Sequence, residues 1–125
     1  MTMTKAPDFT DIEIRKIQSA VNERFRKEVH LEMADTECRL DSETVELTSC
    51  HTVFWREGEF NFVVMKTGDS RYRCQFFGRE LDMFGTGQTE YDDVTECAVS
   101  LLQVQADQER TLAEARDKMG FRPAG

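Results

Sequence analysis

Residues 53–77 read VFWREGEFNFVVMKTGDSRYRCQFF, and this stretch decides the fold. Three runs rich in aromatic and β-branched residues are separated by two clusters of turn-forming residues, at 57–59 and at 67–70. Connections this short join antiparallel neighbours, because parallel strands need a long crossover. The stretch therefore predicts two consecutive β-hairpins.

The strand pattern continues on both sides of this stretch. Upstream, residues 29–40 alternate in short apolar and polar steps, and a turn at 41–44 leads into a strand over residues 45–56. Downstream, Leu81, Met83 and Phe84 predict a short edge strand. Together these segments predict a four- to five-stranded antiparallel meander.

Helices are predicted before and after the meander. Thr10 and Glu13 have the spacing of a capping box, and an apolar stripe follows them, which predicts a helix over residues 11–27. Residues 89–92 are expected to cap a second helix over residues 90–119. That helix would be roughly 45 Å long at 1.5 Å per residue, so either it breaks near Asp107 or its second half projects and packs on something else.

The fold class that follows is α+β, with an N-terminal helix, the meander and a C-terminal helix. We expect both helices to lie on one face of the sheet. Residues 9–120 are predicted to form a single domain, flanked by a disordered N-terminal tail at 1–8 and a C-terminal tail at 121–125.

Composition and charge narrow the class of partner. The 125 residues carry 16 basic and 24 acidic side chains, a net charge of −8, and residues 28–59 alone account for −7. Nucleic acid and anionic lipid repel such a surface, so we expect binding to neither. No apolar segment has the length of a signal peptide or a membrane span, so the expected location is cytoplasmic and away from membranes.

The hairpins also predict which side chains share a face. If residues 67–70 form the turn, Lys66 faces Arg71, and an uncharged face carrying Met65, Tyr72 and Cys74 packs under the helices. The second face is then apolar and aromatic with an arginine rim, as protein interfaces are. Its predicted partner-binding residues are His51, Val53, Trp55, Phe60, Phe62, Arg71 and Arg73. The alternative is that the end of the C-terminal helix, or a curled sheet, covers this face.

The four cysteines, Cys38, Cys50, Cys74 and Cys97, include no C-x-x-C pair, which argues against a zinc site. A turn at 42–43 places Cys38 opposite Leu47, so that it does not meet Cys50. Neighbouring strand residues point to opposite faces, so Cys50 and His51 cannot form a catalytic dyad. We expect buried thiols, no metal, no cofactor and no catalytic residue.

Gly85-Thr86-Gly87 precedes the second helix in the way that a phosphate-binding loop does. The motif is too short for that purpose, and the acids that follow it would repel a phosphate. Helix capping by these acids is the expected role.

The favoured function is a non-catalytic protein-interaction or regulatory module that forms a homodimer or binds a protein partner through the second face. Two alternatives remain open. The acidic residues 28–59 could occupy a basic cleft, as an inhibitor or nucleic-acid mimic does. A small ligand or a substrate could instead bind between the sheet and the C-terminal helix, near His51, Arg71 or Arg73. No convergent catalytic set is visible, so a binding role is favoured over an enzyme.

Overall fold

The computed structural model describes residues 3–40, 43, 46–78 and 83–118. Within these residues the chain forms two helices and six strands, which are β1 (Met3–Lys5), α1 (Asp11–Phe25), β2 (Glu32–Cys38), β3 (Leu47–Glu57), β4 (Phe60–Gly68), β5 (Arg71–Phe77), β6 (Met83–Phe84) and α2 (Val94–Lys118). Most of the turn predicted at 41–44, the strand residue Leu81 and the C-terminal tail at 121–125 lie outside the described residues.

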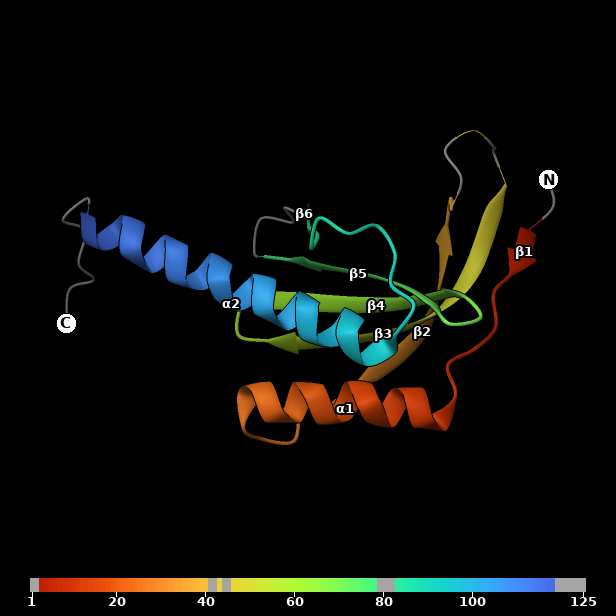
Figure 1. Ribbon diagram of the computed structural model, residues 1–125, viewed down its shortest axis with the longest axis horizontal. Coiled ribbons are helices and arrows are strands. Elements are labelled where there is room, and N and C mark those ends of the chain that lie inside the picture. The colour runs from red at the N-terminus through yellow and green to blue at the C-terminus, as the bar shows by residue number, and fades with distance from the viewer. Residues whose placement is uncertain (1–2, 41–42, 44–45, 79–82, 119–125) are drawn as a thin grey trace.

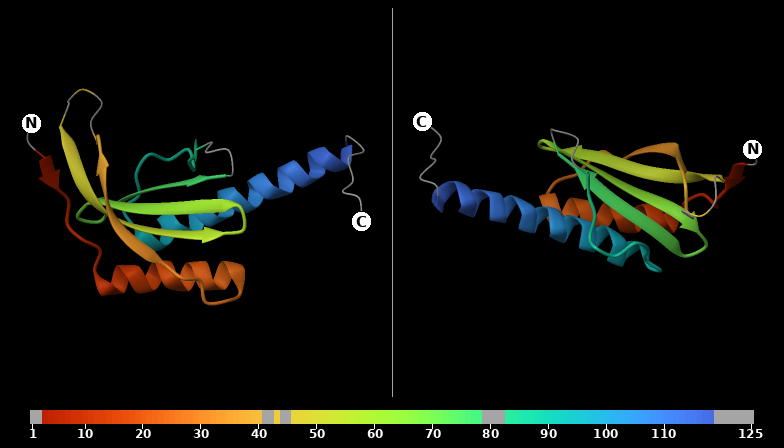
Figure 2. Two further views of the ribbon diagram at one scale, coloured as in Figure 1. Left: turned by 180° about the vertical axis from the view of Figure 1, so that it is seen from behind. Right: turned by 90° about the horizontal axis from the view of Figure 1, so that it is seen from above.

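The six described strands form one sheet (Figure 1). Strands β2 to β6 are the predicted antiparallel meander, and β1 pairs in parallel with the start of β3. Strand β3 pairs with β2 along one edge, so β1 and β4 share the other edge. Both helices lie on the same face of the sheet (Figure 2). The predicted α+β class and the placement of the helices are confirmed.

The N-terminal segment differs from the prediction. We expected residues 1–8 to be a disordered tail, but Met3–Lys5 form β1 and the Ala6 amide donates to the Ser49 carbonyl at 2.9 Å. Ala6 is buried. A three-residue strand held by a partner more than 40 residues away has no local sequence signal, and for that reason the segment was missed.

Helix α1 begins as predicted. The Thr10 amide donates to Glu13 Oε1 at 2.7 Å and the Glu13 amide donates to Thr10 Oγ1 at 3.2 Å, which completes the capping box. The helix ends at Phe25, two residues earlier than predicted, because Arg26 adopts a left-handed conformation with φ of 55°. Ile17 and Val21 are its fully buried residues.

Helix α2 begins later than predicted. The Tyr91 backbone exchanges two hydrogen bonds with Tyr72 of β5, so the chain is still extended there, and Asp93 provides the cap by accepting from the Glu96 amide at 2.8 Å. The helix then runs without a break through Asp107 to Lys118. Its second half extends beyond the sheet (Figure 1), as one of the two predicted outcomes states. Neither described helix is both long and apolar enough to span a bilayer.

The β4–β5 hairpin has a different register from the predicted one. Gly68 pairs with Arg71 across a two-residue turn, and Thr67 forms a bulge, so Lys66 pairs with Tyr72 instead of Arg71. Every β5 side chain therefore faces the side opposite to the one predicted relative to β4. The β3–β4 hairpin has the predicted turn, with Glu57 paired to Phe60.

As a result, the face under the helices is the aromatic one. The Trp55 and Phe62 rings stack with centroids 5.2 Å apart, and Phe76 packs on Phe62 at 6.1 Å. These rings join Val53, Val64 and the buried stripes of both helices in one core. The interface between the sheet and α2, where we considered a ligand pocket, is filled by this core.

Candidate functional site

The face of the sheet turned away from the helices, which we name the open face, is made by three rows of cross-strand neighbours. The rows are Ala34, Thr52, Met65 and Arg73; then Glu32, Phe54, Val63 and Gln75; then Arg56, Asn61 and Phe77. Phe54, Val63 and Phe77 are half-buried and belong to neither of the two hydrophobic clusters found among the described residues. The open face therefore carries apolar side chains that no described helix covers.

The predicted partner-binding surface does not exist as one face. Val53, Trp55 and Phe62 are at most 1% exposed and lie in the core. Phe60 is half-buried and packs against the same core. Val53, Trp55 and Phe62 therefore cannot contact a partner, because the observed register of the β4–β5 hairpin turns this face toward the helices.

The three polar members of the predicted surface are separated. His51 is half-buried, and its Nδ1 accepts from the Phe9 amide at 3.0 Å. Arg71 and Arg73 lie together at the β5 edge, where both approach Glu90. His51 therefore does not join the arginines in a common site.

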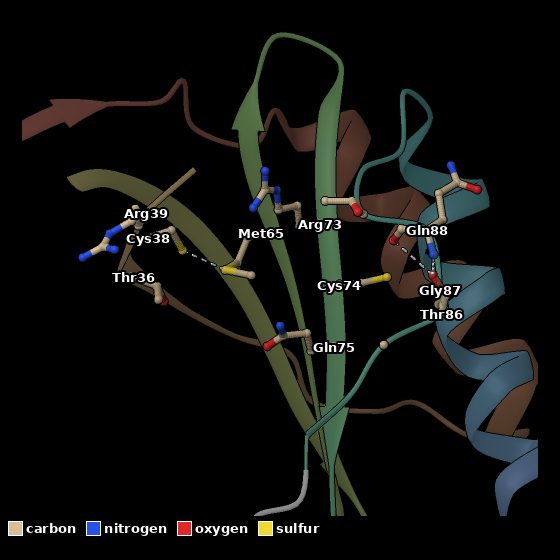
Figure 3. A pocket seen from close by; sticks show the side chains of 12 residues that line it. Thr36, Cys38, Arg39, Met65, Arg73, Cys74, Gln75, Thr86, Gly87 and Gln88 are labelled. Atoms are coloured by element: carbon tan, nitrogen blue, oxygen red, sulfur yellow. Dashed lines mark hydrogen bonds between the residues drawn. The ribbon is translucent and has the colours of Figure 1, made fainter. Parts of the chain in front are cut away.

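A cleft of about 540 Å³ lies at one end of the open face (Figure 3). The end of β2 provides one wall, with Thr36, Cys38 and Arg39, and residues 85–89 provide the opposite wall. Between them lie Met65 of β4 and residues 73–75 of β5. The size of the cleft is within the range of small-molecule sites.

Arg73 ties the two walls together. Its Nη2 donates to the Leu40 carbonyl at 3.3 Å, and its Nε lies 3.5 Å from Glu90 Oε2. Glu90 also accepts from the Thr67 hydroxyl at 3.1 Å and pairs with Arg71 at 3.8 Å. The acid that we expected at the start of a helix thus anchors the loop 85–89 to the sheet.

The same loop leaves part of the β5 edge unpaired. Tyr72 exchanges hydrogen bonds with Tyr91, and Phe76 pairs with Phe84, but no residue of the described loop pairs with Cys74 between them. Because strand residues two apart direct their amide and carbonyl the same way, the Cys74 backbone groups point toward the loop and the cleft. The cleft thus offers one backbone donor and one acceptor.

A second polar cluster joins α1 to the sheet on the helix side. The Lys66 ammonium donates to Glu13 Oε1 at 2.7 Å and to the Asp8 carbonyl at 3.1 Å, and the Tyr72 hydroxyl donates to Glu13 Oε2. The side chains of Lys66 and Glu13 are only 6% and 12% exposed. Each charge is paired, which is the condition for burying ionised groups.

The electrostatics of this cluster keep Glu13 ionised. Burial alone would raise the pKa of Glu13, but hydrogen bonds from Lys66, Thr10 and Tyr72 outweigh it and lower the pKa from 4.5 to about 2. Burial and the bond to Glu13 raise the pKa of Tyr72 above its ordinary value. These contacts join α1 and the segment that precedes it to β4 and β5.

The sequence did not predict the cluster of Lys66, Glu13 and Tyr72, although one signal for it was present. Lys66 alternates with Val64 and Phe62, which is the signal of an inward-facing lysine, but the assumed register placed all three outside. Among the described residues, no group of three His, Cys, Asp or Glu side chains is arranged to hold a metal.

Comparison with protein-family models, curated proteins and solved structures gave no match to this chain.

Proposed function

We propose that this chain is a non-catalytic protein-interaction module, and that its open face binds a second copy of the chain. The observation that carries the proposal is the set of half-buried apolar side chains, Phe54, Val63 and Phe77, at the centre of a face that no described helix covers. Proteins usually bury their large apolar side chains, so a patch of them left at the surface is typical of an interaction site.

The charges on the open face favour a second copy as the occupant. Glu32 lies at its β2 edge and Arg73 at its β5 edge. A two-fold axis parallel to the strands would place the β2 edge of one copy over the β5 edge of the other. Glu32 would then lie opposite Gln75 of the other copy and one row away from Arg73, while the apolar centre packs against itself.

The shape of the open face is also typical of a protein–protein interface. A hollow of about 360 Å³, lined in part by Phe54, Arg56 and Asn61, lies beside the apolar centre, at a distance along the strands from the cleft. Side chains of a partner that enter such hollows contribute most of the binding energy in protein interfaces.

Sedimentation velocity tests the proposal. We expect the wild-type chain to sediment at twice its 14.5 kDa mass and Val63→Arg to sediment as a monomer, because a charge would be buried in the interface. Gln75→Arg is a milder second variant, since Gln75 is already polar and half-buried. The control is Val99→Arg on the outer side of α2, where Val99 is 50% exposed.

Circular dichroism would confirm that each variant is folded. A wild-type chain that sediments as a monomer at every concentration contradicts the proposal. So does a dimer that survives both open-face variants.

A second function is favoured by the exposure of β2. Every residue of this strand except Cys38 is exposed, and in the described chain β2 pairs only with β3. The free edge displays Glu32, Asp35 and Glu37, so an extended basic segment could pair with it as an added strand. This would serve the predicted role of an acidic inhibitor.

Calorimetry with a lysine-rich peptide tests this second function. We expect binding that weakens steeply as salt is raised. Neutralising the strand with Glu32→Gln, Asp35→Asn and Glu37→Gln should abolish it. A control of equal charge, Asp107→Asn with Glu109→Gln and Glu114→Gln on α2, should bind as the wild type does. Equal loss in both triple variants would show that only net charge matters.

A further inference from the structure

Three sulfur atoms from three strands converge on the open face. Cys38 pairs with Thr48, Cys50 pairs with Thr36, and Met65 pairs with Thr52, so all three side chains point to the same side. The Cys38 thiol donates to Met65 Sδ at 3.3 Å (Figure 3). The predicted register, with Cys38 opposite Leu47, was one residue out and separated Cys38 from Cys50.

Cys50 completes the group. The Cys50 thiol donates to the Thr48 carbonyl at 3.8 Å, and Thr48 is the cross-strand partner of Cys38. Cys50 thus lies two residues along β3 from the cross-strand partner of Cys38, on the same side of the sheet. Cys50, Met65 and Ala6 form the second hydrophobic cluster of the described residues, with Cys38 and Leu40 packed against it.

The three donors differ in exposure in a way that suits an ion entering from outside. Cys50 is 0% exposed and Met65 is 8% exposed, whereas Cys38 is half-buried. Cys38 and Met65 both line the 540 Å³ cleft, and their sulfur atoms face each other across the gap between β2 and β4 (Figure 3). The cleft is therefore the entry path, and Cys50 closes the inner side.

We propose that Cys38, Cys50 and Met65 bind one Cu(I) ion. Two thiolates and a thioether are soft ligands, and this combination selects Cu(I) among biological metals. Zinc would require a fourth donor of the Cys, His or carboxylate type, and none converges here among the described residues.

The binding step balances without a redox partner. Copper enters as Cu(I) and leaves the reaction as Cu(I), two copper–thiolate bonds and one copper–thioether bond form, and the two thiol protons pass to solvent. The bound group carries one net negative charge. Arg73, which lines the same cleft and donates to the Leu40 carbonyl, is the cation placed to compensate it.

All three ligands belong to one chain. The Cys74 and Cys97 thiols provide an internal control. The Cys74 thiol donates to the Cys97 carbonyl at 3.7 Å, and both cysteines lie in the core on the helix side of the sheet. A copper response that depends on cysteine count alone would involve them equally.

The test is an anaerobic titration of the reduced protein with Cu(I) against bathocuproine disulfonate, a coloured Cu(I) chelator. We expect the wild type to withdraw one equivalent of Cu(I) from the chelator. Cys38→Ser and Met65→Leu should weaken binding by more than the ~10–100-fold that changes outside the ligand set cost. Cys74→Ser should bind as the wild type does. X-ray absorption of the copper complex should show three sulfur neighbours.

Several outcomes would overturn the proposal. These are retention of all Cu(I) by the chelator, equal weakening by Cys74→Ser, or binding of Zn(II) as tightly as Cu(I). Leucine and methionine have similar volumes, so Met65→Leu should leave the chain folded. Weaker copper binding by this variant would then report the loss of the thioether ligand. Circular dichroism of each variant checks this directly.

Discussion

At the scale of single residues, Glu13 makes more contacts than its place in the capping box predicts. Its carboxylate accepts hydrogen bonds from the Thr10 amide, the Lys66 ammonium and the Tyr72 hydroxyl. One side chain therefore caps α1 and also fixes that helix to β4 and β5. Removing it would leave the Lys66 charge buried and without its carboxylate, and breaking a buried pair in this way typically costs several kcal/mol.

The Glu13 cluster predicts a pH dependence of stability. Folding lowers the pKa of Glu13 from 4.5 to about 2, so its contribution is present above pH 4.5 and is lost as the pH falls toward 2. The full loss, reached below pH 2, amounts to about 3 kcal/mol at 1.36 kcal/mol per pKa unit. Glu13→Gln should be less stable at pH 7 and should lose less stability between pH 5 and pH 2. Urea denaturation at each pH, followed by Trp55 fluorescence, measures both effects.

The matched control is Glu23→Gln, which changes an exposed carboxylate on the same helix. This variant should keep the wild-type stability and its fall in acid. If Glu13→Gln lost as much stability in acid as the wild type does, the Glu13 carboxylate would not be the cause of that loss.

At the scale of elements, α2 is one helix with two environments. Its buried residues end at Gln105, and residues 109–115 are exposed, so the first half packs on the sheet while the second half does not. The apolar stripe nevertheless continues, since Leu112 lies eleven residues after Leu101 and hence on nearly the same side of the helix. The stripe is a sequence feature of the whole helix, while the packing is a property of its first half.

A pair of leucines tests this division of α2. Leu101 is fully buried and Leu112 is 45% exposed. Leu101→Ala should lower the free energy of unfolding by about 3 kcal/mol, as a cavity in the core does. Leu112→Ala should change it by less than about 0.5 kcal/mol, as surface substitutions do. Urea denaturation measures both. Comparable losses would mean that a second chain packs on the projecting half of the helix.

At the scale of the whole molecule, local patterns were sufficient for the class of fold and failed where distant segments meet. The capping box, the turn at Gly58 and the runs of alternating residues are local, and each element that they predict is present. The pairing of β1 with β3 and the delayed start of α2 depend on contacts with distant strands. Local propensity carries no information on such contacts.

The candidate site could be predicted only in outline. The two helices leave one face of the sheet uncovered, as expected. The uncovered face is the one with Phe54 and Val63, whereas the prediction was the face with Trp55 and Phe62. The cleft joins the end of β2 to the loop 85–89, segments about 50 residues apart, so no motif signals it. The sulfur cluster requires the β2–β3 register, which a shift of one residue changes.

The bulge at Thr67 has a consequence for how the chain folds. A growing β4–β5 hairpin can close with Lys66 opposite Arg71, through the four-residue turn that the sequence suggests, or with Lys66 opposite Tyr72. The first closure would direct Arg73 and Gln75 under the helices and turn Phe76 to solvent. A chain in that state cannot slide into the native one, because every cross-strand bond must open first. In the native register the Thr67 hydroxyl donates to Glu90 and the Tyr72 hydroxyl donates to Glu13, so contacts with segments distant in sequence favour this register over the other.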